Sequence, residues 1–512
     1  MQQEQDVFKV DKKILLLLFM ISFTIFIFTT DAHRYTIDED ISQRQTKRIV
    51  TMTPDPLYVE GESHIGFEYS YTQNNNNPLC INAIWCSGVY LGHSLVQIPI
   101  LALNHYFEFI KADTVVWTSN DFNDPHYVWW RNSIDPDFTF LELFYGPIFS
   151  SLSVMIFFAL CKKIPYKNST SVILSLTFGL TTSIWAYSQT SFNLIASSFF
   201  VLLGIFFIYK FLRENNPYVL ILSGLALGFG YMVRNDVILV IGITLIFVIF
   251  HILKTHHKKI YIVNFFIFVS IPIFINRLVN EVRFDISGIT GGSYIPTNDF
   301  PLLVGFTGLL FSPGVGLFIF YPVLSLCIFS FYDFFKKQKY ETFFLISLIL
   351  GYLIFYATFP NWHGMNAWAA RYLLTIIPFM LIPLGASLEK RHYKFWIVVT
   401  ALASIGFLSN IVYVIQDENW FVWGTWGSST GLTSLGSGLA MHPATMWTFE
   451  YSQLTHSIIT GLTNLQVDIF LLKLLGSTVY FITFISILVT LGFILLHHML
   501  YKKTIQSGIL NK

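Results

Sequence analysis

The chain has 512 residues, of which 54% are hydrophobic, 18% aromatic and only 12% charged. A soluble domain usually carries about a quarter charged residues, so this composition excludes an ordinary soluble protein and indicates a membrane protein. The 31 basic and 30 acidic side chains nearly cancel, so bulk charge predicts no nucleic-acid partner. The sequence holds no phosphate-binding loop and no dinucleotide fingerprint, so it does not encode ATP-driven transport.

Basic clusters separate pairs of apolar stretches along the chain. They lie at residues 9–13, 162–167, 210–213, 254–259, 336–339, 390–394 and 502–503. Lysine and arginine that flank a membrane span are retained on the cytoplasmic side, so these clusters should share one face. Two spans fit between neighbouring clusters, which predicts about twelve transmembrane helices with both termini in the cytoplasm.

The apolar stretches give a helical span for each predicted crossing. The predicted spans are 14–30, 142–161, 171–188, 193–212, 218–234, 237–253, 260–278, 313–332, 342–358, 373–388, 394–414 and 470–497. Lipid offers backbone groups no partner, so each span must be a helix of about 20 residues. We therefore expect an all-α polytopic protein of the plasma membrane. The first span lacks a small-residue cleavage pattern and is interpreted as a retained anchor.

The loops opposite the basic clusters are predicted to be exterior, and some should carry short membrane-surface helices. They cover 31–141, 279–312, 359–372 and 415–469, and they hold most of the Asp, Glu, Trp and His residues. A transporter or lipid flippase would concentrate polar groups near the bilayer midplane. The observed distribution favours chemistry or recognition at the outer membrane surface. A transporter, a flippase and a non-catalytic membrane subunit remain the alternatives.

Three adjacent acids, Asp38, Glu39 and Asp40, follow the first span. Repulsion and partial burial tend to raise the pKa of at least one of them, which suits a general base. Their oxygens could also hold a divalent metal such as Mg²⁺ or Mn²⁺. The alternative is a solvated acidic loop that marks the end of a helix.

Four further segments follow these acids in order. They are CSGVYLGHSLVQIP at 86–99, GLALGFGYMVRND at 224–236, LFSPGVGLFIFYP at 310–322 and WHGMNAWAARYLLTIIP at 362–378. Together with the Asp-Glu pair, they resemble the polyprenyl-phosphate-dependent glycosyltransferases of the membrane-embedded C superfamily. The similar branch is that of protein O-mannosyltransferases and aminoarabinose transferases. One departure is the strongly polar stretch 40–48, where that family usually has an amphipathic helix rich in Tyr and Ala.

The resemblance covers roughly residues 14–388 and implies a division of the chain. Residues 1–388 would form a glycosyltransferase-like transmembrane domain with the first exterior loop, 31–141. Residues 389–512 would form a C-terminal transmembrane region with the exterior loop 415–469. The implied reaction moves a sugar from a polyprenyl- or dolichyl-phosphate donor, such as dolichyl phosphate mannose, to a protein, lipid or glycan acceptor. The resemblance implies a single displacement at the exterior face that inverts the anomeric centre of the sugar.

The resemblance also implies roles for residues at the acceptor and phosphate ends of such a site. Asp38 would be the base, with Glu39 as its orienting or metal-binding partner. Arg371 and Arg234 would bind the leaving phosphate, because the planar guanidinium fork suits bidentate phosphate recognition. The alternative for each arginine is an interfacial side chain that reaches lipid headgroups.

Aromatic residues and histidine near the predicted phosphate end are weaker candidates. His363 could contact the donor phosphate or sugar, and Trp362 and Trp368 could stack on sugar faces. Interfacial enrichment of tryptophan explains the same residues without a ligand. Cys80 and Cys86 share an exterior loop and could form a disulfide in an oxidising compartment.

Overall fold

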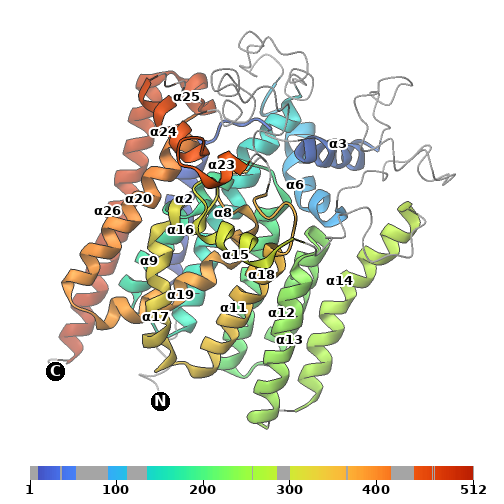
Figure 1. Cartoon of the computed structure of the whole chain (residues 1–512), viewed down its shortest axis with the longest axis vertical. Coiled ribbons are helices and arrows are strands. Elements are labelled where there is room, and N and C mark those ends of the chain that lie inside the picture. Colours follow the sequence, from blue (N-terminus) through green and yellow to red (C-terminus); the bar gives the residue numbers. More distant parts are fainter. Residues whose placement is uncertain are drawn as a thin grey trace.

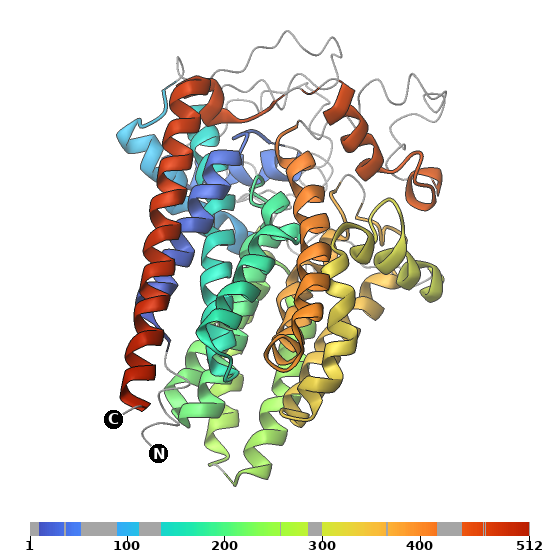
Figure 2. The same ribbon diagram turned by 90° about the vertical axis from the view of Figure 1, so that its left-hand side faces the viewer.

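The computed structural model describes residues 10–34, 37–52, 90–111, 135–256, 258–284, 300–364, 367–416, 443–463, 465 and 467–510. All the regular elements in this part of the chain are helices, and one isolated β-bridge joins Gln416 to Val467. The helices form one elongated bundle (Figures 1 and 2). The predicted all-α class is therefore confirmed for the described residues.

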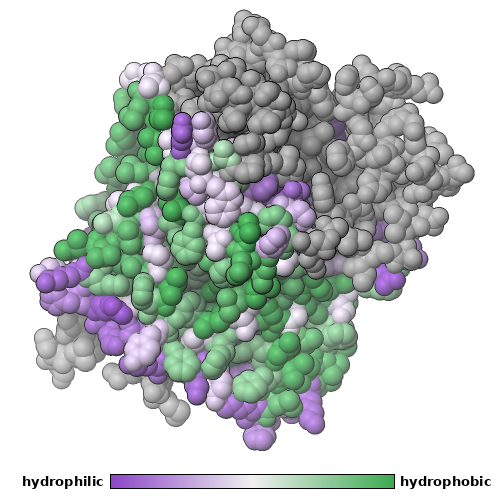
Figure 3. All heavy atoms as spheres, in the orientation of Figure 1, coloured by the Kyte–Doolittle hydropathy of each residue, from purple (hydrophilic) through white to green (hydrophobic). Residues whose placement is uncertain are grey.

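Nine helical segments in the described ranges are long and apolar enough to cross a membrane. They are α2 (Lys12–Thr29), α8 (Pro136–Lys163), α11 (Asn193–Glu214), α13 (Val237–Lys254), α14 (Ile260–Phe284), α18 (Lys339–Ala357), η5 with α19 (Arg371–Ile376 and Ile377–Lys390), α20 (Tyr393–Val414) and α26 (Ser477–Leu510). Hydrophobic side chains dominate the visible surface in the middle of the bundle, and hydrophilic ones gather at its lower end (Figure 3). The chain is a multi-pass membrane protein.

The three remaining predicted spans are short or broken. Span 218–234 is the shorter helix α12 (Pro217–Val233), and span 171–188 is split into α9 (Asn168–Leu180) and α10 (Ser183–Tyr187). Span 313–332 falls in a chain of short helices, α15 (Leu302–Phe311), α16 (Leu317–Phe320), η4 (Pro322–Leu324) and α17 (Ser325–Phe335). Proline lacks the amide that a continuous helix needs, which explains breaks at 313 and 322. Twelve spans with cytoplasmic termini stay a prediction.

Ion pairs connect several basic clusters at one end of the bundle. Lys163 Nζ lies 2.7 Å from Glu214 Oε1, and Arg213 Nη2 lies 3.8 Å from Glu341 Oε1. The amide of Lys167 donates to Glu389 Oε1 at 2.7 Å. The beginning of α2 and the end of α26 lie at this end as well (Figure 1). Several of the clusters that the sequence predicts on one face therefore share one end, and its cytoplasmic orientation stays a prediction.

The shorter helices gather mainly at the opposite end, which we call the outer end. They are α3 (Ile37–Thr51), α6 (Leu91–Phe107), α23 (Pro443–Trp447), α24 (Gln453–Thr463) and α25 (Phe470–Leu475). They surround the upper part of the bundle in Figure 1. Short surface helices in exterior loops are what the sequence predicts.

Residues 181–192 interrupt the helical path between α9 and α11. Polar side chains donate hydrogen bonds to nearby backbone carbonyls that lack a helical partner. Asn410 Nδ2 donates to the carbonyls of Leu180 at 3.2 Å and Thr182 at 2.8 Å. Gln189 Nε2 donates to Thr29 O at 2.6 Å and to Val414 O at 2.7 Å. The last carbonyls of a helix lack intrahelical donors, so Gln189 joins the ends of α2 and α20 to the break.

Replacing Gln189 with leucine should destabilise the bundle. The change leaves two buried carbonyls without their donor, at a cost of about 1–3 kcal/mol each. We expect the midpoint of thermal unfolding in detergent to fall clearly below that of the wild type. Ser404→Ala is the matched control, because exposed Ser404 bonds only to Thr400 O in its own helix. Equal midpoints for both variants would contradict the capping role of Gln189.

Candidate functional site

An acidic cluster lies at the outer end, where α3, α8 and the 181–192 break meet. Glu39 Oε1 accepts the amide hydrogen of Ser191 at 3.0 Å. The hydroxyl of the same serine donates to Glu142 Oε1 at 2.7 Å, and Gln43 Nε2 also donates to Glu142 Oε1. All four residues are at most 1% exposed. Two carboxylates thus share one serine in a buried setting, where their like charges repel each other.

The acidic cluster has unused hydrogen-bond acceptors on both α3 and α8. Glu142 Oε2 and Gln43 Oε1 are buried and have no hydrogen-bond partner. Asp31, which is 1% exposed, and Arg34 lie within electrostatic range of Glu142. A buried acceptor without a donor costs free energy, so a hydroxyl or amine group would bind favourably there.

A glycine sets how closely the break approaches α8. A Cβ atom at Gly146 would lie 2.1 Å from Ser188 O and 2.9 Å from Thr190 O. No larger residue fits without moving the backbone of the break. Because Gly146 lies one turn after Glu142, this close approach brings Ser191 within reach of the Glu142 carboxylate.

His93 on α6 contacts the opposite side of the same serine. Its Nε2 lies 2.8 Å from Ser191 O, and a carbonyl can only accept, so this nitrogen carries the proton. Burial lowers the pKa of His93 to about 4, although the hydrogen bond to Ser191 opposes the shift. Thr46 Oγ1 donates to Gln97 Oε1 at 2.8 Å and so ties α3 to α6 beside this histidine.

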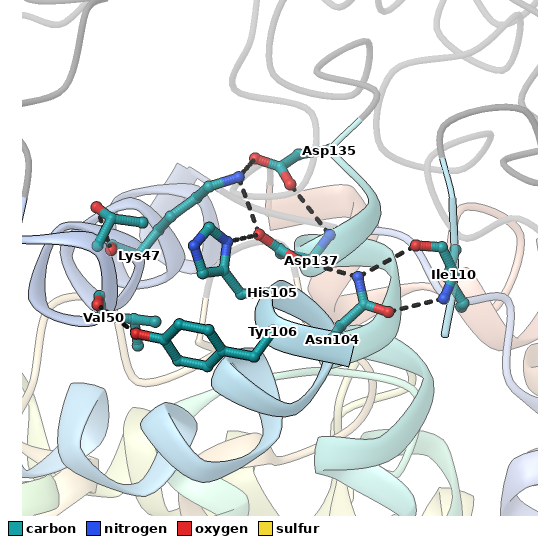
Figure 4. Close-up of polar contacts among 9 residues, drawn as sticks. Lys47, Val50, Asn104, His105, Tyr106, Ile110, Asp135 and Asp137 are labelled. Carbon is teal, nitrogen blue, oxygen red and sulfur yellow. Dashed lines mark hydrogen bonds and ion pairs between the residues drawn. The ribbon is translucent and has the colours of Figure 1, made fainter. Parts of the chain in front are cut away.

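A second polar network fastens α3 and α6 to the beginning of α8 (Figure 4). Lys47 Nζ lies 3.1 Å from Asp137 Oδ2 and also bonds to Asp135. Asn104 Nδ2 donates to Asp137 Oδ1 at 2.9 Å, and His105 Nδ1 lies 3.1 Å from Asp137 Oδ2. Burial would lower the pKa of Lys47, but the two aspartates outweigh it and raise the pKa. The network holds the helices that carry Glu39 and His93.

Arg234 and Arg371, which we call the arginine pair, lie against one aromatic ring. Their guanidinium carbons are 5.6 Å and 5.1 Å from the centroid of Tyr372. Arg234 Nε donates to Asp236 Oδ1 at 2.9 Å, and Arg234 Nη2 donates to Tyr356 OH at 3.0 Å. Arg371 Nε is buried without a hydrogen-bond partner. Two positively charged guanidinium groups therefore lie close together, and one of their N–H donors is unused. A bound anion would stabilise this arrangement.

His363 and Gly364 border the arginine pair. Burial, together with the charge of Arg371, lowers the pKa of His363 to about 4. Gly364 has a φ of +81°, and a Cβ atom there would lie 2.9 Å from Arg371 Cγ. The glycine therefore permits both the turn and the close approach of the arginine side chain.

A carboxylate–histidine group ties the end of α2 to the C-terminal region. His33 Nε2 lies 2.9 Å from Asp468 Oδ2 and 3.7 Å from Asp31 Oδ2, and Lys473 Nζ lies 2.7 Å from Asp468 Oδ1. Burial would raise the pKa of Asp468, but His33 and Lys473 hold it well below its usual range. The ligand atoms of Asp31, His33 and Asp468 lie within 4.8 Å of one another, a spacing compatible with a metal. Ion pairing among these residues already accounts for the arrangement.

The structure brings several predicted site residues together. Glu39 is part of the acidic cluster, Arg234 and Arg371 lie together against Tyr372, and His363 lies within electrostatic range of Arg371. The backbone of residues 38 and 40 belongs to α3, but the side chains of Asp38 and Asp40 lie outside the described residues. Their roles as base and metal ligands stay predictions, and Cys80 and Cys86 also lie outside the described ranges.

The predicted sugar-stacking tryptophans are buried. Trp362 is 3% exposed, and its ring lies against Gly308, where a Cβ atom would be 2.3 Å away. Trp368 is 1% exposed and stacks on Tyr413 with a centroid distance of 4.5 Å. Their contact with a sugar stays a prediction.

Sequence reasoning missed Asp31, Glu142 and Ser191. Glu142 is a lone acid in the apolar run FLELFYG at 140–146, and an ionisable residue at the beginning of a span is a signal for function. Asp31 directly follows the first span, but the three adjacent acids further along drew the prediction instead. Nothing in the sequence singles out Ser191, because its contacts depend on tertiary packing.

Neither a family model nor a curated protein sequence matches the chain. Among solved structures, it is similar to the crystal structure of ArnT from Cupriavidus metallidurans in the apo state. The two chains are 10% identical with a TM-score of 0.47, and the match covers 90% of this chain and 76% of that chain.

Acid should destabilise the protein through His93. Its pKa is about 4 in the folded protein and about 6.5 when unfolded, so the unfolded state binds the extra proton first. Stability should therefore fall as the pH drops from 6.5 to 4, by roughly 3 kcal/mol from this residue. Thermal unfolding of His93→Gln across this range should show a shallower loss. His392→Gln, at an exposed histidine, should keep the wild-type slope; identical slopes for all three proteins would refute the assignment.

Substituting Gly364 with alanine should displace Arg371. The new methyl group would clash with Arg371 Cγ and would also strain a backbone with positive φ. We expect weaker binding of an anionic phosphate ligand by about tenfold or more, with a smaller loss of folding stability. Gly242→Ala is the control, because a Cβ atom there meets nothing within 4 Å. Isothermal titration with a short polyprenyl phosphate measures the effect, and unchanged affinity would count against the arrangement.

Proposed function

We propose that the chain is an integral membrane glycosyltransferase. It takes a sugar from a polyprenyl- or dolichyl-phosphate donor and transfers it to a protein, lipid or glycan acceptor at the exterior face of the plasma membrane. The observation that carries the proposal is the arginine pair at Tyr372, where Arg371 Nε is buried without a partner. The ordered motifs of the sequence and the buried acidic cluster support it.

The proposed reaction is one inverting displacement at the anomeric carbon of the donor sugar. The acceptor oxygen or nitrogen forms the new bond, and the bond from the anomeric carbon to the phosphate oxygen breaks with its electron pair. The departing phosphate becomes more negative, and the arginine pair stabilises this charge. A carboxylate removes the acceptor proton, and we propose Asp38 for this role with Glu39 beside it.

A divalent metal, Mg²⁺ or Mn²⁺, is part of the proposal at Asp38, Glu39 and Asp40. Glu39 has the carboxylate chemistry that such a metal prefers, and the amide of Ser191 holds its Oε1 in place at 3.0 Å. When bound, the metal would supply positive charge at these carboxylates. The residues of the chain itself perform the proton transfer.

A lipid or sugar transporter is the second candidate. The 181–192 break favours it, because interrupted helices with buried polar groups commonly line transport sites. A transporter would move the intact lipid or its headgroup between leaflets without cleaving the sugar–phosphate bond. The fate of that bond therefore separates the two candidates.

Purified protein in liposomes should release sugar from a radiolabelled polyprenyl-phosphate donor to an acceptor. We expect Asp38→Asn to abolish transfer, and Arg371→Met to lower kcat/KM by about a hundredfold, since a lost charged hydrogen bond is worth about 1.5–3 kcal/mol. Arg391→Met is the matched control at the opposite end of the bundle, where Arg391 pairs with Asp333.

Donor panels with different sugars, with and without Mg²⁺ or Mn²⁺, would identify the substrate and any metal dependence. Full transfer by Asp38→Asn would overturn the assignment of the base. Movement of labelled lipid between leaflets without sugar release would favour the transporter.

A further inference from the structure

We infer that residues 191–193, here the 191–193 segment, position the two ends of the active site relative to each other. The inference rests on the proposed glycosyltransferase function. Ser191 belongs to the acidic cluster, and Phe192 and Asn193 contact the arginine pair. Ser191 and Asn193 are therefore positioning residues of one reaction, although neither needs to touch the reacting atoms.

Every polar group of Ser191 takes part in a hydrogen bond. Its amide donates to Glu39 at 3.0 Å, and its hydroxyl donates to Glu142 at 2.7 Å and accepts from Gln43 Nε2 at 3.0 Å. Its carbonyl accepts from His93 at 2.8 Å. Groups from α3, α6 and α8 thus converge on one buried residue, which fixes the orientation of both glutamates.

The next two residues face the phosphate end. The guanidinium carbon of Arg371 lies 5.7 Å from the ring centroid of Phe192. Asn193 Oδ1 accepts from Arg234 Nη1 at 3.4 Å, so each arginine has one contact on the segment. These contacts leave Arg371 Nε without a hydrogen bond, which keeps that donor available for a phosphate oxygen.

Chain geometry then limits the separation of the two points at which the segment contacts the two ends. The Cα atoms of residues 191 and 193 are at most about 7 Å apart, because two peptide units span no more. Such a spacing is close to the size of one sugar ring, which must lie between the proton acceptor and the leaving phosphate. A displacement reaction requires both groups to be placed at once, on opposite sides of the anomeric carbon.

The 191–193 segment cannot slide easily, because the residues before it are fastened. Gly146 lets the backbone at Ser188 and Thr190 press against α8. Gln189 donates to the ends of α2 and α20, and the hydroxyl of Tyr187 donates to Trp368 O at 2.9 Å. Trp368 lies three residues before Arg371, so the anchor also reaches the loop that carries this arginine.

Two alanine variants two residues apart test the inference. Ser191→Ala should lower kcat by about 10- to 100-fold and shift the pH–rate profile, while the KM for the donor stays unchanged. Asn193→Ala should raise the KM for the donor about tenfold with an unchanged pH–rate profile. Ser191→Thr, which keeps the hydroxyl, should recover most of the lost kcat and serves as the folded substitute if Ser191→Ala does not fold. A merely structural role would change the same parameter in both variants, and that result would overturn the inference.

A binding measurement separates failure of this inference from failure of the proposed function. If the wild type transfers no sugar, the proposed function fails, and binding of farnesyl phosphate to detergent-solubilised protein decides the inference. Asn193→Ala should then weaken binding about tenfold, whereas Ser191→Ala should bind as the wild type does. Equal affinities of the two variants would overturn the positioning role.

Discussion

The arrangement of the outer end depends on satisfying backbone groups where a helix breaks inside the bundle. The membrane interior offers no water to an unpaired carbonyl, so a break persists only if side chains supply the missing donors. Asn410 supplies them to Leu180 and Thr182, and Gln189 caps the ends of α2 and α20. These bonds fix the path of residues 181–192. The same path delivers Ser191 to the acidic cluster and Asn193 to Arg234, so the satisfaction of the backbone and the geometry of the site have one cause.

Polar networks at the outer end position helices more than they stabilise the fold. Lys47 is 31% exposed, and a partly exposed ion pair contributes little free energy. The ion pairs of Lys47 instead join α3 to the beginning of α8. Asp135 and Asp137 precede Glu142 by less than two turns, so this link lies close to the acidic cluster. His93 acts from the other side, where its Nε2 donates to Ser191 O at 2.8 Å. Glu39 and Glu142 are thereby held close together, although their charges repel each other.

The sequence predicts most of the spans, because length, hydropathy and flanking lysines are local properties that lipid enforces directly. It fails where a break of a few residues is hidden in an apolar stretch, as at Thr181 and Thr182. The arginine pair is predictable in type and position, since each arginine lies at the end of a predicted span. Its convergence on Tyr372 is not, because the two residues are distant in sequence. Glu142 and Ser191 escape prediction for the same reason: their meeting requires the close approach at Gly146. The side chain of Asp38 lies outside the described residues, so its role stays a prediction.

The C-terminal region has no recognisable motif, yet its contacts go to the segments that carry the motifs. Gln453 donates to the carbonyls of Gly314 and Ala367, in the loops before α16 and η5. Asp468 pairs with His33, and Tyr480 OH donates to Phe28 O at the end of α2 at 2.5 Å. Each contact supports a helix end or a loop at the outer end of the bundle. The predicted boundary near residue 388 therefore rests on the motifs alone, because in the packed structure the last helices contact the outer end and support it. Such support requires only hydrogen-bond donors at the right places. This explains how the C-terminal region can stabilise the site without a sequence motif of its own.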